Sequence, residues 1–245
     1  MIPSLAPLFT GPLAEHGEKL QLRSHPRTDV PGDRFFQHEY FGAFVDDLQA
    51  RYKTDERLAL VSLWSKWYFS TFLTPVMAAN LLQQCDLPLA LADTGVQLGN
   101  DARPQALHLR HAGHPLGPCT AFERFHTLIE GHLEPVIETL VKVSRASPRL
   151  FWSNAGNTFE FVTSRIDLHP LASAHSTAPA REILNARLRP NGRRNPLFAP
   201  VHYHDIGEDE PQRLRRICCI RYRLPGVGYC SSCPLDECKR QEQPV

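Results

Sequence analysis

The sequence has no excess of charge of either sign, and this absence excludes several classes of function. Its 245 residues include 27 Lys plus Arg against 26 Asp plus Glu, a formal net charge of +1. Such a chain has no global attraction for nucleic acid or for an anionic membrane, so any electrostatic function requires a local patch. With 42% hydrophobic and 22% charged residues, the composition indicates one large or two small globular domains.

Long apolar runs are missing too. The longest uncharged stretch, 67–85, contains several polar residues and a proline, which is typical of a buried amphipathic helix and not of a membrane span. The first residues carry no positive charge and are interrupted by prolines, so we expect no secretory signal. The expected location is the cytoplasm, where grouped thiols indicate metal or redox chemistry because disulfides are rare.

Nucleotide and hydrolase motifs are also absent. The sequence contains no G-x-G-x-x-G after a predicted strand, no G-x-x-x-x-G-K-[ST], no G-x-S-x-G and no H-E-x-x-H. A chain without a nucleotide or flavin motif is not expected to take hydride directly from NAD(P)H. Any redox activity therefore requires another protein as electron donor.

The apolar periodicity predicts a mostly helical α+β fold with a small β-sheet. Residues 1–33 are rich in Pro and Gly, which favours a loosely structured leader. Alternating apolar residues indicate two strands, at 95–98 and 106–109. Helical spacing covers 35–52, 56–82, 120–144, 149–166 and, in a proline-rich stretch, 182–187, with bends expected at Pro75 and Pro135.

Cysteine is concentrated at the C-terminal end. Five of the seven cysteines lie in the last 28 residues, at positions Cys218, Cys219, Cys230, Cys233 and Cys238. The C-x-x-C spacing of the second pair suits two thiolates on one metal. Adjacent side chains on a strand point to opposite faces, so the vicinal first pair fits a two-iron cluster more easily than one zinc ion. Structural zinc nevertheless stays an alternative at this point.

The residues around the cysteine pairs also favour a cluster. The turn at 225–229 brings backbone N–H groups close to the thiolates, and such donors tune reduction potentials. Arg221 and Arg223 lie between the two pairs, where positive charge would help a cluster accept an electron.

The tail resembles that of the FhuF-type ferric siderophore reductases, whose signature is C-C-x10-C-x2-C. The segments 62–68 (SLWSKWY), 150–154 (LFWSN) and 195–197 (NPL) are similar to blocks of the same family in the same order. The resemblance covers residues 60–233, and the cysteine signature is its specific part.

This resemblance implies a cytoplasmic iron–sulfur protein that passes one electron to iron(III) in a hydroxamate siderophore. It implies a [2Fe–2S] cluster on Cys218, Cys219, Cys230 and Cys233, with no role for Cys238. The expected organisation is a leader (1–33), a siderophore-docking region (34–200) and a cluster segment (201–245). The electron donor is expected to be a protein such as a ferredoxin or its reductase, and association with the membrane surface is left open.

Several residues have both a functional and a structural interpretation. Trp64, Trp67 and Trp152 are candidates for the wall of a siderophore pocket, although aromatics at helical spacing are more often core. Ser153 and Asn154 suit either a ligand contact or a turn. A basic stretch is as consistent with a solvated loop as with docking of an acidic donor. Its members are Arg181, Arg187, Arg189, Arg193 and Arg194.

Two other functions remain alternatives on the sequence. A zinc ribbon with flanking arginines would make the protein a binding module for nucleic acid or protein. An iron–sulfur cluster that is lost as a signal would make it a redox sensor. The histidines at 108, 111 and 114 and at 202 and 204 complete no recognisable ligand spacing, so a second metal site is not expected.

Overall fold

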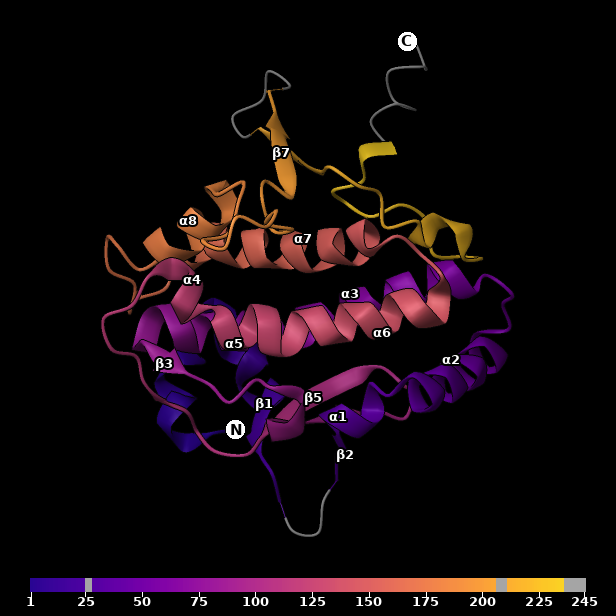
Figure 1. The fold of residues 1–245 in the computed structure, drawn as a ribbon, viewed down its shortest axis with the longest axis horizontal. Coiled ribbons are helices and arrows are strands. Elements are labelled where there is room, and N and C mark those ends of the chain that lie inside the picture. Colours follow the sequence, from indigo (N-terminus) through magenta and orange to yellow (C-terminus); the bar gives the residue numbers. More distant parts are fainter. Residues whose placement is uncertain (25–27, 206–210, 236–245) are drawn as a thin grey trace.

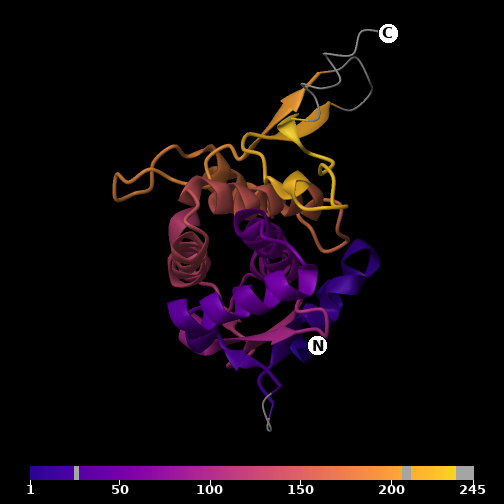
Figure 2. The same cartoon turned by 90° about the vertical axis from the view of Figure 1, so that its right-hand side faces the viewer.

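The computed structural model describes residues 1–24, 28–205 and 211–235, and it is built in layers. In Figure 1 a small sheet lies below the helices α3 and α6, α7 lies above them, and the C-terminal segment lies above α7. Figure 2 shows the same segment projecting from the helical body. The predicted mostly helical α+β fold is confirmed.

The helices and strands have the following bounds. The α-helices are α1 (Gly32–Phe35), α2 (His38–Tyr52), α3 (Arg57–Gln83), α4 (Ala121–Arg124), α5 (His126–Leu128), α6 (Glu134–Ser144), α7 (Pro148–Ile166) and α8 (Ala178–Asn185). The 3-10 helices are η1 (Pro3–Leu8), η2 (Gly11–Lys19), η3 (Leu91–Asp93) and η5 (Arg221–Arg223), and η4 (Ile129–Leu133) is a π-helix. The main sheet has the order β1 (Leu20–Leu22), β5 (Pro104–Leu109), β4 (Thr94–Leu98) and β2 (Val30–Pro31). The strands β3 (Cys85–Asp86) and β6 (His114–Pro115) form one pair, and β7 (Val201–His204) and β8 (Gln212–Arg215) another.

The helix α3 is the centre of the molecule. It is apolar on almost all sides, which is typical of a helix that is covered all round. Trp64 and Tyr68 stack at a centroid distance of 5.3 Å and lie among the phenylalanines of α1 and α2. The predicted helices at 35–52, 56–82 and 149–166 and the two predicted strands are all present.

The helix predicted for residues 120–144 is interrupted. Its first turn, α4, is closed by a capping box between Thr120 and Glu123, and a π-helical turn then precedes α6. This turn directs His132 into the core, where Nδ1 donates to the Leu89 carbonyl at 2.7 Å and Nε2 accepts from the Tyr68 hydroxyl at 2.7 Å. The π-helical turn thus contains an imidazole with both ring nitrogens hydrogen-bonded in the core.

The N-terminal residues are more ordered than their proline content indicates. Ile2, Leu5 and Leu8 are spaced by three, which is the period of a 3-10 helix, and all three are buried in the main core. The strand β1 then pairs in parallel with β5, whereas the other pairs of the main sheet are antiparallel, including the predicted one between β4 and β5. The buried residues Ile2, Leu5 and Leu8 and the pairing of β1 with β5 therefore order this segment in spite of its prolines.

No helix within the described residues combines the length and the apolar character needed to cross a lipid bilayer.

Stability should depend on pH through His132. Burial lowers the pKa of this imidazole from 6.5 to about 4. Because the unfolded chain binds the proton more tightly, stability is lost as pH falls from 6.5 towards 4, by up to about 3 kcal/mol. His132→Gln keeps a donor and an acceptor but does not titrate. Urea unfolding followed by tryptophan fluorescence at pH 7 and pH 4 should therefore show a smaller loss of stability in the variant, and equal losses would contradict this account.

Candidate metal centre

Four cysteine sulfurs meet in the C-terminal segment. The Sγ atoms of Cys218 and Cys233 are 3.9 Å apart, and those of Cys219 and Cys230 are 3.8 Å apart. All four are free thiols. Both sulfur–sulfur distances are much longer than the roughly 2.05 Å of a disulfide bond. Two thiolates on one tetrahedral metal, each at about 2.3 Å, are about 3.8 Å apart, so each pair has the separation that a shared metal requires.

Each vicinal cysteine is thus paired with one cysteine of the C-x-x-C pair, and the Cys218 thiol also contacts the Cys219 sulfur. Within the described ranges, no group of three or more His, Cys, Asp or Glu side chains is arranged to hold a single metal ion. Two sulfur pairs, each with the separation of two thiolates on one metal, suit a cluster of two metal atoms. The residues present therefore fit a [2Fe–2S] group.

The surroundings of the Cys219 sulfur favour negative charge. Hydrogen bonds with the Cys218 and Cys230 thiols lower the pKa of Cys219, and the positive charges of Lys66 and Arg215 act in the same direction. Correspondingly, the pKa values of Cys218 and Cys230 are raised, mainly by their hydrogen bonds with Cys219 and then by burial. The Lys66 Nζ lies 3.5 Å from the Cys219 sulfur. A group bound through thiolates would meet fixed positive charge here.

Arg215 supplies the most deeply buried of these charges. Its exposed fraction is 0%, and its Nε and Nη1 atoms have no hydrogen-bond partner within the described residues. A buried guanidinium without a carboxylate is costly unless other negative charge is close. The neighbouring sulfurs can provide that charge, which is a second indication that an anionic cluster fits this place.

Side chains of α3 and α7 hold the backbone around the vicinal cysteines. The Ser62 hydroxyl donates to the carbonyl of Cys219 at 2.8 Å, and the Ser153 hydroxyl donates to the carbonyl of Ile217 at 3.2 Å. Ser62 and Ser153 both belong to the aromatic blocks noted in the sequence. Their role here is to position the cysteine segment.

Asn154 completes this attachment. Its Nδ2 donates to the Ser62 carbonyl and hydroxyl, at 3.2 and 3.1 Å, and to the Ser65 hydroxyl at 2.9 Å. Its Oδ1 accepts from Arg215, which also donates to the Ser153 hydroxyl at 3.2 Å. Asn154 is buried, so one amide side chain links α3, α7 and the end of β8.

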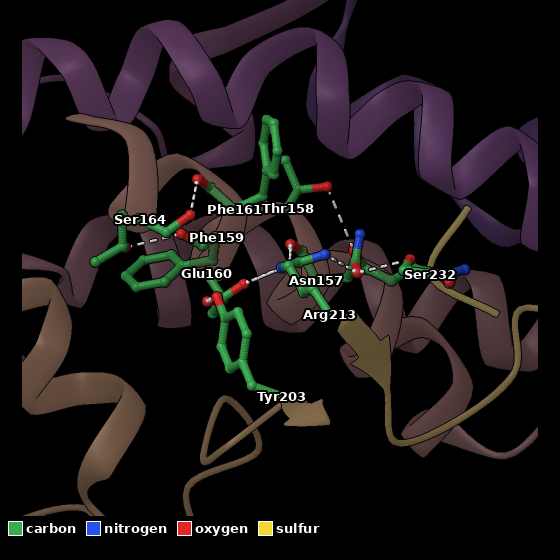
Figure 3. A network of polar contacts seen from close by, with 11 residues as sticks. Asn157, Thr158, Phe159, Glu160, Phe161, Ser164, Tyr203, Arg213 and Ser232 are labelled. Carbon is green, nitrogen blue, oxygen red and sulfur yellow. Dashed lines mark hydrogen bonds and ion pairs between the residues drawn. The ribbon is translucent and has the colours of Figure 1, made fainter. Parts of the chain in front are cut away.

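A second polar network fixes the hairpin that leads into the cysteines (Figure 3). From β8, the Arg213 Nε donates to Glu160 on α7 at 2.6 Å, and Nη2 donates to the Asn157 carbonyl at 2.7 Å. From β7, the Tyr203 hydroxyl donates to the same carboxylate at 2.5 Å. The hairpin was not predicted from the sequence, because its strands are short and mostly polar.

A cavity of about 830 Å³ lies beside this site, and only one of the three candidate tryptophans is among its lining residues. Trp67 is half-buried and lines the cavity. Trp64 lies in the core, and its indole donates to the Ala102 carbonyl at 3.1 Å. Trp152 is half-buried against the core and does not line this cavity.

The two candidate arginines also differ. Arg221 lines the cavity and donates to the carbonyls of Gly228 and Tyr229, at 3.1 and 2.5 Å, so it also braces the loop between the cysteine pairs. Arg223 pairs with Glu56 at 2.9 Å, and its side chain is 48% exposed. Arg221 therefore contacts both the cavity and the loop between the cysteine pairs, whereas Arg223 forms a surface ion pair.

The basic stretch at 181–194 is partly neutralised. Arg181 pairs with Asp167 at 3.0 Å, and the buried Arg189 pairs with Glu134 at 2.6 Å. Of the remaining cysteines, Cys85 is half-buried and Cys119 is exposed. Cys238 lies outside the described residues.

Comparison with known protein families shows to which family the chain belongs. A model of the family described as "Ferric iron reductase FhuF-like transporter" matches residues 62–211, and one described as "FhuF 2Fe-2S C-terminal domain" matches residues 215–235. The chain belongs to the FhuF family. A relative named "Ferric siderophore reductase", from Escherichia coli (strain K12), is 29% identical over 197 residues, which are 74% of this chain and 67% of the relative.

Membership in the FhuF family confirms the resemblance seen in the sequence. The protein is an iron–sulfur oxidoreductase, a ferric-chelate reductase, and its C-terminal segment carries a [2Fe–2S] cluster. The four cysteines all lie inside the residues matched by the cluster-binding part of the family.

Removing the Asn154 side chain should loosen the cysteine segment. Asn154→Ala takes away hydrogen bonds to α3 and leaves Arg215 with one partner fewer, so we expect a loss of roughly 3 kcal/mol in the free energy of unfolding. Ser164→Ala, an exposed position on the same helix, should change it by less than about 0.5 kcal/mol. Denaturant titration measures both values. A loss in Asn154→Ala no larger than in the control would show that this amide is not an anchor.

Positive charge next to the cysteine sulfurs should raise the reduction potential of the [2Fe–2S] cluster. Lys66→Gln removes the ammonium closest to Cys219, so the added electron is less stabilised and the midpoint potential should fall by roughly tens of millivolts. Arg221→Gln should act in the same direction. Arg223→Gln is the control, because a half-exposed charge is screened by solvent and should shift the potential less. Potentiometric titration followed by EPR gives the three values, and an unchanged potential in Lys66→Gln would contradict the argument.

Proposed function

We propose that the thiolates of Cys218, Cys219, Cys230 and Cys233 hold the cluster, and that the substrate is iron(III) bound by a hydroxamate-type siderophore. The observation that carries the assignment is the pair of sulfur–sulfur separations, 3.9 and 3.8 Å, each matching two thiolates on one metal. A siderophore as substrate is supported by the relative from Escherichia coli, which is named a ferric siderophore reductase. Release of iron(II) in the cytoplasm completes the proposal.

The chemistry needs little beyond one electron. Iron(III) is a hard cation that oxygen donors hold tightly, whereas iron(II) is held far less tightly by the same ligands. When bound, a [2Fe–2S] cluster supplies electrons one at a time. No general acid or base is required, and the role of the chain is to position the sulfurs and the chelate.

The contacts described above suit that role. Ser62 and Ser153 fix the backbone on which the vicinal cysteines lie. The amide of Ile220 donates to the Cys218 sulfur at 3.3 Å, and such N–H donors stabilise negative charge on sulfur. The sulfurs are therefore held before any substrate arrives.

The electron has to come from another protein, because the sequence contains no nucleotide or flavin motif. We propose a ferredoxin or its reductase as the donor. Cys218 is only half-buried, whereas Cys219 is 1% exposed, so the Cys218 edge of the site is the one open to a protein partner.

The ligand assignment predicts a specific loss in single variants. Protein purified without oxygen should contain two irons and two sulfides per chain and give a spin-half EPR signal on reduction. Cys230→Ser should abolish the visible spectrum and the reduction of ferric hydroxamates, because a thiolate ligand is lost. Cys119→Ser, at an exposed cysteine outside the segment, should leave both intact.

Two outcomes would overturn the proposal in different ways. A colourless, zinc-loaded protein would assign the segment to a structural zinc site. A normal cluster that does not reduce ferric hydroxamates, even after chemical reduction, would leave the ligands in place and remove the substrate.

A further inference from the structure

The cavity of about 830 Å³ lies between η2, α3 and α7, and Arg221 of η5 also lines it. Its volume is within the roughly 300–1,000 Å³ typical of small-molecule sites. Aromatic and apolar side chains form much of its wall, including Trp67, Phe161 and Leu168. Phe161 and Leu168 are 49% and 66% exposed, which places apolar surface where a ligand could cover it.

The cavity adjoins the cysteine site. Lys66 lines the cavity, and its Nζ is 3.5 Å from the Cys219 sulfur. Arg221, two residues beyond Cys219 in the chain, lines it as well. A molecule in the cavity would therefore be separated from the sulfurs by little more than one side chain.

The charge of the cavity wall is unbalanced. Its cationic members are Lys19, Lys66, Arg165 and Arg221, and Glu15 is the carboxylate among the lining residues. Glu15 lies 3.5 Å from His16. None of the four cations pairs with a carboxylate in the part of the chain that the structure describes. Unpaired cations around an apolar pocket favour an anionic ligand.

We propose that this cavity is the siderophore site and that it selects ferric hydroxamates that carry additional free carboxylates. The proposal rests on the proposed function and specifies its substrate. Three hydroxamate groups balance the charge of iron(III), so the core of such a complex is neutral and the net negative charge comes from the remaining carboxylates. Arg165 and Lys19 bind those carboxylates, and the aromatic wall covers the apolar part of the complex.

Gallium(III) complexes test the site without electron transfer, because gallium(III) has the charge of iron(III) and is not reduced. Binding of a carboxylate-bearing and of a neutral gallium hydroxamate to the full-length protein can be followed by tryptophan fluorescence and calorimetry. In Arg165→Gln the Kd of the anionic complex should rise about tenfold or more, as expected for a lost charge-assisted hydrogen bond. The Kd of the neutral complex should change by less than about threefold.

The control is Arg149→Gln, which removes the same charge from an exposed position on α7 that does not line the cavity. It should leave both Kd values unchanged. Ser70→Trp places a large ring at an exposed lining position of α3 and should weaken both complexes at least tenfold. The circular dichroism spectrum and the cluster absorption of each variant establish that it is folded.

The outcomes separate this inference from the reductase activity. If Ser70→Trp binds both complexes as the unmodified protein does, the cavity is not the siderophore site, although the protein can still be a reductase. If Arg165→Gln weakens both complexes equally, or neither, the selection for carboxylates is wrong. If both gallium complexes bind as expected but the ferric forms are not reduced, the site stands and the proposed activity falls.

Discussion

The hydrogen bond between Asn154 and Arg215 is the contact on which the arrangement of the metal centre depends. It joins the end of β8 to α7, and through the other atoms of the same amide it reaches α3. The bond is buried, so water cannot replace either partner and the two groups must meet. Cys218 and Cys219 follow Arg215 by three and four residues, so this hydrogen bond also fixes their position.

The remaining supports act on the same short stretch of chain. Serine hydroxyls fix the carbonyls of Ile217 and Cys219, and the network around Glu160 fixes the hairpin that precedes them. Gly156 on α7 allows the chain at Pro200 to approach closely, since a Cβ at that position would lie 2.8 Å from the proline side chain. The segment 195–197 contributes through Asn195, whose amide donates to the carbonyls of Ile183 and Ala186. Two of the three sequence blocks that resemble the FhuF family thus support the C-terminal segment directly, and the third is bonded to the end of α8.

The sequence predicts the long helices and the central strand pair because their apolar periodicity is strong. It also predicts the cysteine segment, because C-C-x10-C-x2-C is a specific spacing. It does not predict the order of the N-terminal residues, the hairpin of β7 and β8 or the π-helical turn. These features depend on contacts between residues far apart in the chain, such as Leu20 with Leu107 and Tyr68 with His132. The role of Asn154 was equally hidden, since a single amide in an aromatic block gives no indication of its distant partner.

The fully buried guanidinium of Arg215 limits how the cysteine segment can be exchanged between proteins during evolution. Residues 215–235 do not form a self-sufficient module, because the partners of that side chain lie on α7, more than 50 positions earlier in the chain. Transplanting the cysteine sequence into an unrelated protein would bury a cation without Ser153 and Asn154 to receive it. Recombination that separates the two parts would therefore be selected against, so the helical body and the cysteine sequence should have descended together.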